Sequence, residues 1–228
     1  MQIVIGTKNK GKLREIRSIY RQWLGKRKSF LILIPLSDFP NVPDVKETGR
    51  NYLDNARKKA LSWARCTGQI VLAEDSGIEI EALNWRPGIR SARFASNDKH
   101  RNATDNENHT KLLAALSGLD RRRRRARYRC TAVLASPQAV PHLCGAHPKK
   151  GVLVVSDGVC HGYIAQNPAG TNGFGYDPLF CPVGKNYSNR TFGQIPASIK
   201  NRLSHRGKAI RKIFQELSKI LDTAFKSH

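Results

Sequence analysis

The N-terminal segment of the chain limits its fold most strongly. The apolar run Ile3–Ile5 leads directly into a stretch rich in glycine and lysine, Gly6–Lys12, and apolar residues then recur at helical spacing from Leu13 to Leu24. A strand that passes through a glycine-bearing turn into a helix is typical of α/β folds. Such a turn points backbone N–H groups at the space above the helix N-terminus, where anions are favoured. The segment therefore predicts either a phosphate-binding loop or a basic surface turn.

The stretch resembles a P-loop but differs from it at one position. Gly6, Gly11 and Lys12 have the P-loop spacing, but Leu13 stands where a P-loop has Ser or Thr. That hydroxyl ligates magnesium, so its replacement argues against a P-loop ATPase. It does not argue against phosphate binding. If the loop does bind phosphate, the metal ligands must lie elsewhere in the chain.

The rest of the pattern predicts a mixed β-sheet flanked by helices. Strands first alternate with helices and then cluster, and we find no internal repeat and no linker, so we predict one domain over residues 1–228. We expect strands at 30–34, 70–73, 78–83, 128–135, 152–155 and 162–164, and helices at 47–60, 108–119 and 204–225. We expect a turn at 84–88 and a surface loop at 137–150.

The composition suits a cytoplasmic protein with a sizeable core. The chain has 228 residues, of which 39% are hydrophobic, enough for a domain that folds independently. No stretch approaches the roughly 18 apolar residues of a membrane span, and no secretory signal is visible. The five cysteines show neither CxxC nor metal-ligand spacing, so we expect reduced thiols.

The net charge of +23 raises the question of nucleic-acid binding. Seven arginines fall within Arg121–Arg129, but taking seven from +23 still leaves +16, so the basicity is spread along the chain. Aromatic residues do not alternate with these arginines as they do in single-strand-binding surfaces. We therefore interpret the run, including Arg121–Arg125, as a solvated loop, and we expect no specific nucleic-acid binding. Dispersed positive charge would also attract an anionic substrate.

Adjacent carboxylates at Glu74 and Asp75 are candidate metal ligands. They follow the apolar run Ile70–Ala73 and precede Ser76-Gly77, so we expect a strand that ends in a turn at the carboxyl edge of the sheet, where α/β proteins bind ligands. Successive strand residues point to opposite faces, so one acid would face the site while the other supports it. Glu47, which we expect at the head of the second helix, is a further candidate ligand. One or two carboxylates with substrate phosphates suffice for magnesium. The alternative is a turn with solvated acids.

Two further segments carry residues suited to a planar, polar ligand. In Gly170–Pro178, Phe174 and Tyr176 lie among glycines, which would let a base approach closely; a tight turn with core aromatics is the alternative. In Lys200–Ala209, Ser204 is a good N-cap and places His205 and Arg206 in the first turn of a helix. Cations are unfavourable there, which suggests an anionic or carbonyl partner.

Taken together, five motifs resemble the inosine triphosphate pyrophosphatase family. They are TKNKGK (Thr7–Lys12), ETG with NARKKA behind it (Glu47–Ala60), EDSGIEIEALNWRPGIRSARFA (Glu74–Ala95), GFGYDPLF (Gly173–Phe180) and KNRLSHR (Lys200–Arg206). The resemblance runs from Ile3 to about Lys212. It implies an α/β fold with two lobes around a substrate cleft, a magnesium cofactor and a homodimer. It also implies hydrolysis of deaminated purine triphosphates (ITP, dITP and XTP) to the monophosphate and pyrophosphate.

The resemblance also implies a role for each motif residue. Asp75 would be catalytic and bind magnesium, Glu47 would be its partner ligand, and Glu74 would support the site. Phe174 would stack on the base, and His205 and Arg206 would read its 6-keto edge. The implied substrate-binding residues are Thr7, Lys8, Asn9, Lys10, Gly11, Lys12, Lys59, Ser76, Phe174, Gly175, Tyr176, Asp177, Lys200, His205 and Arg206.

The sequence departs from the usual pattern of this family at three places, and it leaves two alternative functions open. Many bacterial members have Asp at the position of Glu74, Asn172 replaces a glycine of the usual loop, and Gly193–Ile199 lacks acids that relatives carry. One rival is a nucleic-acid-binding module. The other is a related pyrophosphatase that acts on dTTP or UTP, against which the Ser-His-Arg motif and the aromatic loop argue.

Overall fold

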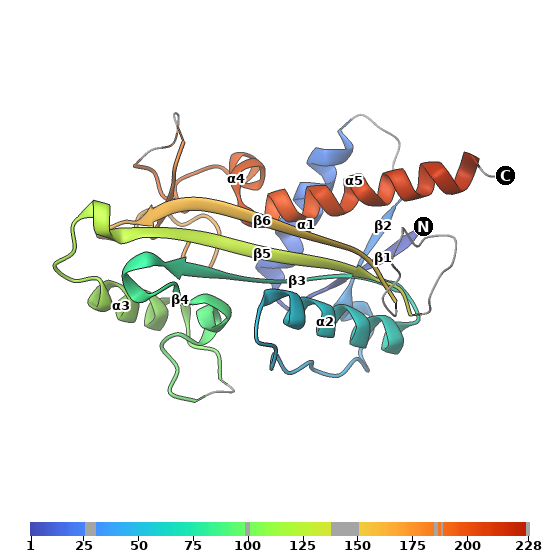
Figure 1. Ribbon diagram of the computed structural model, residues 1–228, viewed down its shortest axis with the longest axis horizontal. Helices are drawn as coiled ribbons and strands as arrows, with labels where there is room; N and C mark the ends of the chain where they lie inside the picture. Colours follow the sequence, from blue (N-terminus) through green and yellow to red (C-terminus); the bar gives the residue numbers. More distant parts are fainter. Residues whose placement is uncertain (26–30, 99–100, 138–150, 185–186, 188, 227–228) are drawn as a thin grey trace. The chain divides into compact units, whose positions relative to one another are not determined.

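The computed structural model describes residues 1–25, 31–98, 101–137, 151–184, 187 and 189–226 (Figure 1). The chain divides into two compact units. Unit 1 comprises Met1–Asp75, Cys130–Gly158 and Arg206–His228, and unit 2 comprises Ser76–Arg129 and Val159–His205. The predicted loop at 137–150, apart from its first residue, and Cys144 lie outside the described residues.

Among the described residues, seven strands form one mixed sheet in the order β2-β1-β3-β5-β6-β7, with β4 paired to β3. β1 is parallel to β2 and to β3, whereas the pairs β3–β4 and β6–β7 are antiparallel. The predicted mixed sheet flanked by helices is therefore confirmed. The strands are β1 (Gln2–Gly6), β2 (Ile32–Pro35), β3 (Ile70–Ile80), β4 (Arg86–Pro87), β5 (Arg125–Ala135), β6 (Val152–Ile164) and β7 (Phe180–Pro182).

The helices begin at capping residues that the sequence supplies. Asn9 and Asn51 each accept a backbone N–H bond at the start of α1 and α2, and Thr104 forms a capping box with Glu107 at the start of α3. The α-helices are α1 (Lys10–Leu24), α2 (Tyr52–Thr67), α3 (Asp105–Ala115), α4 (Ala197–Leu203) and α5 (His205–Lys226). Short 3₁₀ helices are η1 (Leu36–Asp38), η2 (Glu81–Leu83), η3 (Gly88–Arg93) and η4 (Arg121–Arg124).

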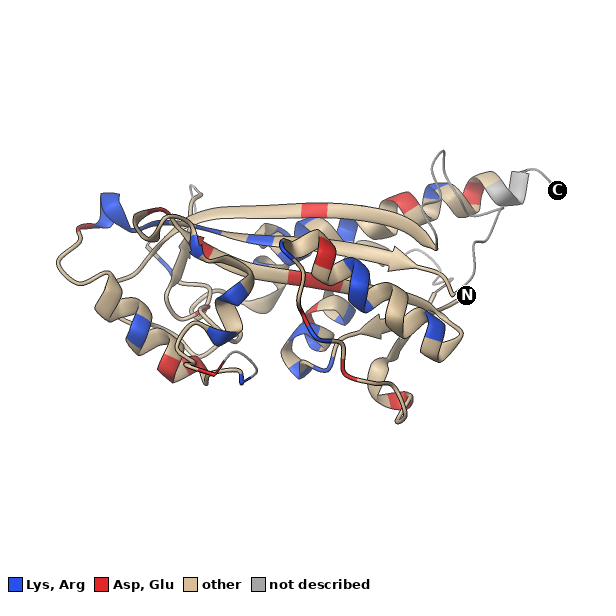
Figure 2. Ribbon diagram, turned by 60° about the horizontal axis from the view of Figure 1, so that its bottom comes forward, with Lys and Arg blue, Asp and Glu red and all other residues tan. Residues whose placement is uncertain are grey.

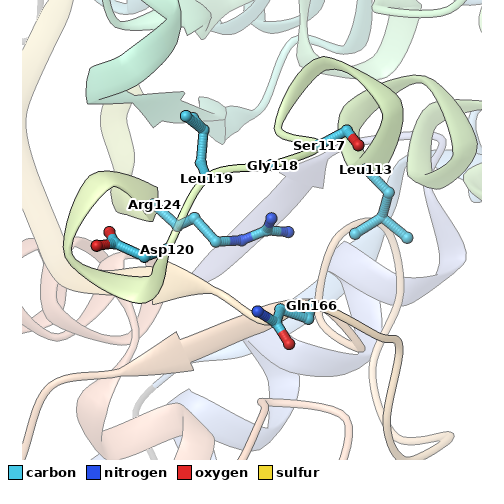
Figure 3. Close-up of a pocket in the computed structure, with 7 residues that line it drawn as sticks. All are labelled: Leu113, Ser117, Gly118, Leu119, Asp120, Arg124 and Gln166. Atoms are coloured by element: carbon cyan, nitrogen blue, oxygen red, sulfur yellow. The ribbon is translucent and has the colours of Figure 1, made fainter.

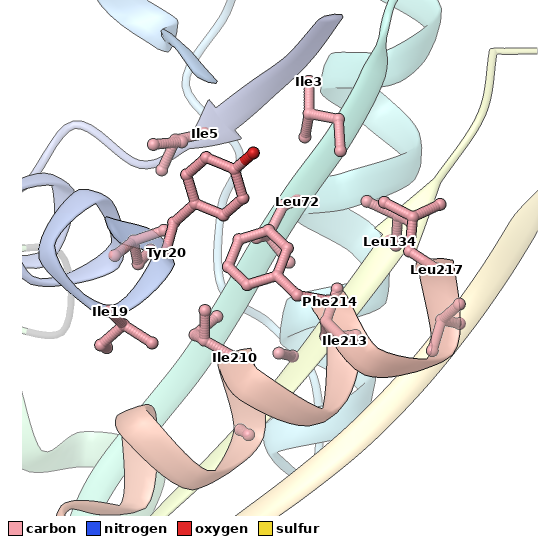
Figure 4. Close-up of a cluster of buried hydrophobic side chains, with 14 of the residues drawn as sticks. Ile3, Ile5, Ile19, Tyr20, Leu72, Leu134, Ile210, Ile213, Phe214 and Leu217 are labelled. Atoms are coloured by element: carbon pink, nitrogen blue, oxygen red, sulfur yellow. The ribbon is translucent and has the colours of Figure 1, made fainter. Parts of the chain in front are cut away.

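Unit 1 buries aliphatic side chains on both faces of its strands. One cluster packs Ile3 and Leu72 against Ile210 and Phe214 of α5, with Tyr20 of α1 beside them (Figure 4). A second cluster packs α2 through Ala56, Ala60 and Trp63 against Val4, Val71 and Val133. Because both faces of β1 and of the first part of β3 are covered, Ile3–Ile5 and Ile70–Ala73 are continuous apolar runs, as parallel strands usually are.

Unit 2 has a more aromatic core. The ring of Tyr128 packs against those of Phe180 and Phe192, with centroids 4.8 and 6.3 Å away. Arg124 is also buried there, and its guanidinium donates to the backbone carbonyls of Leu116, Ile164 and Ala165. These bonds satisfy a buried cation without a carboxylate.

The predicted turn after Asp75 is wrong. β3 continues from Ile70 to Ile80, so Glu74 and Asp75 lie in the middle of a strand and not at its end. Gly77 serves close packing, because a Cβ atom there would lie 2.2 Å from the carbonyl oxygen of Gly88. A glycine that permits a close backbone approach therefore gives the same sequence signal as a glycine in a turn. The two short strands predicted at 152–155 and 162–164 are likewise one strand, β6.

The second helix and the arginine run also differ from the predictions. α2 begins at Tyr52 because Asn51 caps it, so Glu47 lies in the irregular segment before the helix. The arginine run is not a solvated loop: η4 covers Arg121–Arg124, β5 begins at Arg125, and Arg124 is buried. α4 and β7 were not predicted.

The remaining elements agree with the sequence. β1, β2, α1, α3 and α5 lie where strands and helices were expected, although residue 30 is outside the described residues. The chain reverses at residues 84–88, where Asn84 has a φ of 53° and β4 pairs with β3. Within the described part of the chain, no helix has the length and apolar character needed to cross a membrane.

Candidate functional site

The loop after β1 is built around the cap of α1. The Asn9 side chain accepts from the Lys12 backbone N–H at 3.0 Å, and the Thr7 hydroxyl accepts from the Asn9 N–H at 3.2 Å. Lys8 and Lys10 are exposed, and the Lys8 ammonium lies 2.6 Å from Asp44. The first turn of α1 contains Gly11 and no acid. This geometry leaves an electropositive helix terminus, as an anion-binding loop requires.

Glu74 and Asp75 are both buried and have partners from different elements. Because successive residues of a strand point to opposite faces, each carboxylate meets its own set of cations. Asp75 contacts side chains of α2, whereas Glu74 contacts side chains of α1 and α5. Figure 2 shows how acidic residues (red) and basic residues (blue) are distributed over the strands and helices.

Lys59 joins the two predicted metal ligands of unit 1. Its ammonium lies 2.7 Å from Glu47 Oε1 and 3.3 Å from Asp75 Oδ1, and Asn55 donates to Asp75 Oδ2 at 3.0 Å. Burial raises the pKa of Asp75; Lys59 opposes this rise and Glu47 adds to it. Burial opposes the charge of Lys59, but Asp75 and Glu47 outweigh it and raise the lysine pKa. The cluster thus holds two carboxylates around one cation.

Glu74 lies in a network in which the effect of two cations on its pKa outweighs that of burial. Its Oε1 atom lies 2.8 Å from the Lys12 ammonium and 3.3 Å from Nη2 of Arg206, which also binds Glu15 at 2.6 Å. Burial alone would raise the pKa of Glu74, but Arg206 and Lys12 hold it well below its usual value. Burial likewise opposes the charge of Arg206, and Glu74 and Glu15 overcome it and raise the pKa. This pair of acids and pair of bases is charge-balanced.

The donor atoms around Asp75 fit a magnesium ion. Carboxylate oxygens are its preferred protein ligands, and it commonly takes only one or two of them with substrate phosphates and waters. Asp75 and Glu47 converge on one ammonium, which shows that a single cation can reach both. The described residues contain no group of three or more acidic, histidine or cysteine side chains around a common point.

In unit 2, the loop that contains Phe174–Asp177 is held by its own polar atoms. Asp177 Oδ2 accepts from the Phe174 N–H at 2.8 Å and from the Lys200 ammonium at 2.5 Å. Tyr176 is buried and donates from its hydroxyl to the Ser91 carbonyl. Gly175 has a φ of 60°, which favours glycine. Phe174 remains partly exposed on this fixed loop.

Lys200 and His205 lie in unit 2, on α4 and at the start of α5. The Lys200 ammonium lies 5.2 Å from the centre of the Phe174 ring, which places a cation beside the aromatic residue expected to stack on a base. The His205 ring stacks on that of Tyr128, with centroids 4.4 Å apart and an angle of 5° between planes. Ser76 is the remaining predicted residue of this unit and lies partly exposed on β3.

The structure therefore groups the predicted residues into two sets. Unit 1 brings together Lys12, Glu47, Lys59, Glu74, Asp75 and Arg206, and unit 2 brings together Phe174, Asp177 and Lys200. Sequence reasoning missed Asn55 and Glu15, whose roles depend on contacts with residues 20 and 191 positions away. The Asn in the NARKKA motif was a signal for the first; nothing marked the second.

A separate hollow in unit 2 contains none of the predicted site residues. It measures about 420 Å³ and lies beside the end of α3 (Figure 3). Its lining includes Leu113, Asp120 and Gln166, with Arg124 at its wall. The Arg124 guanidinium already donates to the backbone carbonyls of Leu116, Ile164 and Ala165.

Comparison with known proteins identifies the family. A model of the Ham1 family matches residues 3–216. The chain belongs to the Ham1 family. Solved structures agree: a HAM1 protein from Coxiella burnetii is 35% identical and covers 96% of this chain and 99% of its own, with a TM-score of 0.75. The Ham1 protein of Staphylococcus aureus is 32% identical over 96% of this chain and 99% of its own, with a TM-score of 0.73.

Curated Ham1 relatives carry the name dITP/XTP pyrophosphatase. One from Desulforamulus reducens is 37% identical over 96% of this chain and 97% of its own length. One from Streptococcus pyogenes is 42% identical over 93% of this chain, and the chain spans only 58% of that relative's length. The resemblance inferred from the five motifs is thus confirmed.

Proposed function

We propose that this Ham1 protein hydrolyses deaminated purine nucleoside triphosphates, namely ITP, dITP and XTP, to the monophosphate and pyrophosphate. The observation that carries the proposal is the cluster of buried Asp75 and Lys59 with partly exposed Glu47 in unit 1. It combines two acids that one cation can reach with a lysine suited to a phosphate. Removal of such nucleotides would keep hypoxanthine and xanthine out of DNA and RNA.

Unit 1 would handle the triphosphate. Thr7, Asn9 and Lys12, with Lys8, Lys10 and Gly11 of the same loop, would bind phosphate oxygens at the start of α1. Lys59 would turn from the acids toward the leaving pyrophosphate. Asp75 would orient the attacking water or take its proton, and its raised pKa suits that role because a base works best when its pKa approaches the working pH.

Asp75 and Glu47 would hold Mg²⁺ when the substrate is bound. The ion would supply charge neutralisation for the phosphates. Asn55 donates to the Asp75 oxygen that does not face Lys59, and so fixes the direction of the carboxylate. Glu74 would act as support by holding Lys12 and Arg206.

Unit 2 would hold the base. Phe174 would stack on it, with Gly175, Tyr176, Asp177, Lys200 and Ser76 shaping the loop and its surroundings. His205, together with Arg206 of unit 1, would donate to the 6-keto oxygen of hypoxanthine or xanthine. Adenine has an amino group there, so two donors would meet and remain unpaired, at a cost of about 1–3 kcal/mol each. Selectivity against ATP of about a few hundredfold follows from such a difference.

A panel of nucleoside triphosphates tests the proposal. We expect Mg²⁺-dependent release of pyrophosphate from ITP, dITP and XTP at rates far above those for ATP, with the monophosphate as the second product. Preference for dTTP or UTP would assign the chain to the related pyrophosphatases. Absence of pyrophosphate from every triphosphate, with tight salt-sensitive binding of nucleic acid, would contradict enzymatic function altogether.

The assembly and location complete the proposal. We infer a cytoplasmic homodimer in which residues 1–228 act as one catalytic domain. Sedimentation of the full chain at several concentrations checks the dimer, because a dimer's apparent mass falls toward that of the monomer on dilution.

A further inference from the structure

The loop that contains Phe174 is held in place by α3, a helix that none of the five motifs includes. Both backbone polar groups of Gly175 are bound by side chains of α3. The Gly175 N–H donates to Asp105 Oδ2 at 2.7 Å, and the Gly175 carbonyl accepts from His109 Nε2 at 2.8 Å. All of these residues belong to unit 2.

The spacing of the two side chains makes this arrangement a helical feature. Asp105 and His109 are four residues apart on α3, so they lie on the same face of the helix, one turn apart. Asp105 is in the first turn, where the helix dipole favours a carboxylate. A carbonyl oxygen can only accept, so His109 carries its proton on Nε2. One acceptor and one donor on α3 thus match the one donor and one acceptor of Gly175.

These bonds control the direction of the neighbouring side chains. The N–H of Gly175 belongs to the peptide plane shared with Phe174, and its carbonyl belongs to the plane shared with Tyr176. A glycine is the most flexible residue of the loop, and Gly175 has a positive φ with nothing within 4 Å of a Cβ position. Without the bonds from α3, the two planes could rotate and carry Phe174 with them.

We propose that Asp105 and His109 form a clamp that positions Phe174 for the base of the substrate. They are positioning residues, because they act through the backbone of Gly175. The proposal rests on the proposed function in which Phe174 stacks on the base. It adds that the affinity of the protein for the base depends on α3, which makes two hydrogen bonds to Gly175.

The clamp itself is tested by amide hydrogen exchange at Gly175 in the free protein. We expect Asp105→Ala to speed this exchange about tenfold relative to wild type, since its acceptor is lost. Asn106→Ala, which changes the exposed neighbour on the same helix, is the matched control and should leave the rate unchanged. Equal rates in Asp105→Ala and Asn106→Ala would overturn the clamp.

Its effect on the ligand is tested by calorimetric binding of inosine and of pyrophosphate. We expect His109→Leu to weaken inosine about five- to tenfold, His109→Gln to restore most of that affinity through its amide donor, and neither to change pyrophosphate binding. Thr110→Leu is the control on the exposed face. In the ITP assay, the loss should appear in KM more than in kcat.

Two failures are distinguishable. A wild-type protein that neither binds inosine nor hydrolyses ITP contradicts the proposed function. A wild-type protein that does both, while His109→Leu matches Thr110→Leu, contradicts the clamp alone.

Discussion

The two units stabilise their buried polar groups in different ways. Unit 1 pairs formal charges: Glu74 with Lys12 and Arg206, and Asp75 with Lys59. Unit 2 also has a buried ion pair, Lys200 with Asp177, but there Arg124 donates to three backbone carbonyls and both backbone polar groups of Gly175 are bound by α3. Paired charges suit a substrate part that is itself highly charged. Oriented backbone and aromatic groups suit a planar base, for which shape matters more than charge.

Within unit 1, the pKa values of the neighbouring acids Glu74 and Asp75 are shifted in opposite directions. Cations hold the pKa of Glu74 well below its usual value, whereas burial raises that of Asp75. Glu74 is therefore held in its ionised form more firmly than Asp75. Pairs whose environments separate their pKa values commonly mark an active site.

The largest effect is expected from Asp75→Asn. The change keeps the side-chain shape but removes the proposed metal ligand and base, so turnover of ITP should fall by about 10³-fold or more. Thermal unfolding should stay near that of wild type, since the ionised carboxylate is costly to bury. Pyrophosphate release and a melting curve on the same sample measure both. Near-normal turnover would remove Asp75 from the mechanism.

Arg124→Met should produce the largest loss of stability. Three carbonyl oxygens would lose their donor, at about 1–3 kcal/mol for each that stays buried, so the free energy of unfolding should fall by at least about 3 kcal/mol. Chemical denaturation checks this value. The matched control is Arg123→Met on the exposed side of η4, which should change stability by less than about 0.5 kcal/mol. Equal effects would show that the buried guanidinium contributes nothing special.

Glu74→Gln should destabilise the protein in a manner that depends on pH. At neutral pH we expect a loss of about 3 kcal/mol, because Arg206 and Lys12 lose a buried counter-charge. The pKa of Glu74 is lower in the folded state than its usual 4.5, so its contribution is present above pH 4.5 and disappears as pH falls through the folded value. Denaturation of variant and wild type at pH 7 and at pH 3 should therefore show a gap that narrows in acid. A constant gap would contradict the charge pairing.

Arg206→Lys tests whether a residue of unit 1 also takes part in recognising the base. Arg206 belongs to unit 1 yet is expected to read the base, and lysine keeps the charge but loses the planar fork. We expect the ratio of kcat/KM for ITP over ATP to fall about tenfold, with a smaller change in stability. Arg202→Lys is the same change at an exposed site nearby and should leave the ratio intact. An unchanged ratio in Arg206→Lys would leave base reading to unit 2.

Local sequence patterns predicted β1 and α1 because the spacing of apolar residues within each segment is enough to indicate a strand or a helix. The Ile3–Ile5 run and the helical spacing after Leu13 depend only on residues close by in the chain. Gly77 was misinterpreted because its reason is a contact with the Gly88 carbonyl, which no local pattern shows. The length of β6 was missed for a similar reason, since Gly158 and Gly162 resemble strand ends but lie within one strand.

The candidate site was predictable mainly where motifs carry it. The residue pattern supplied Asp75, Glu47 and Phe174 as candidates, and the resemblance added Lys59 and gave each residue a role. Residues that hold those side chains in place were not predictable. Asn55, Glu15 and His109 act through contacts between segments far apart in the chain, and no spacing rule links them to their partners.

The central claim is that unit 1 binds the triphosphate while unit 2 binds the base. Binding of pyrophosphate and of inosine, each alone, to Lys12→Met and Phe174→Ala tests it most directly. We predict that Phe174→Ala weakens inosine about tenfold through lost stacking and leaves pyrophosphate within about twofold. Lys12→Met should weaken pyrophosphate about tenfold and leave inosine within about twofold. Equal losses of both ligands in both variants would contradict the account.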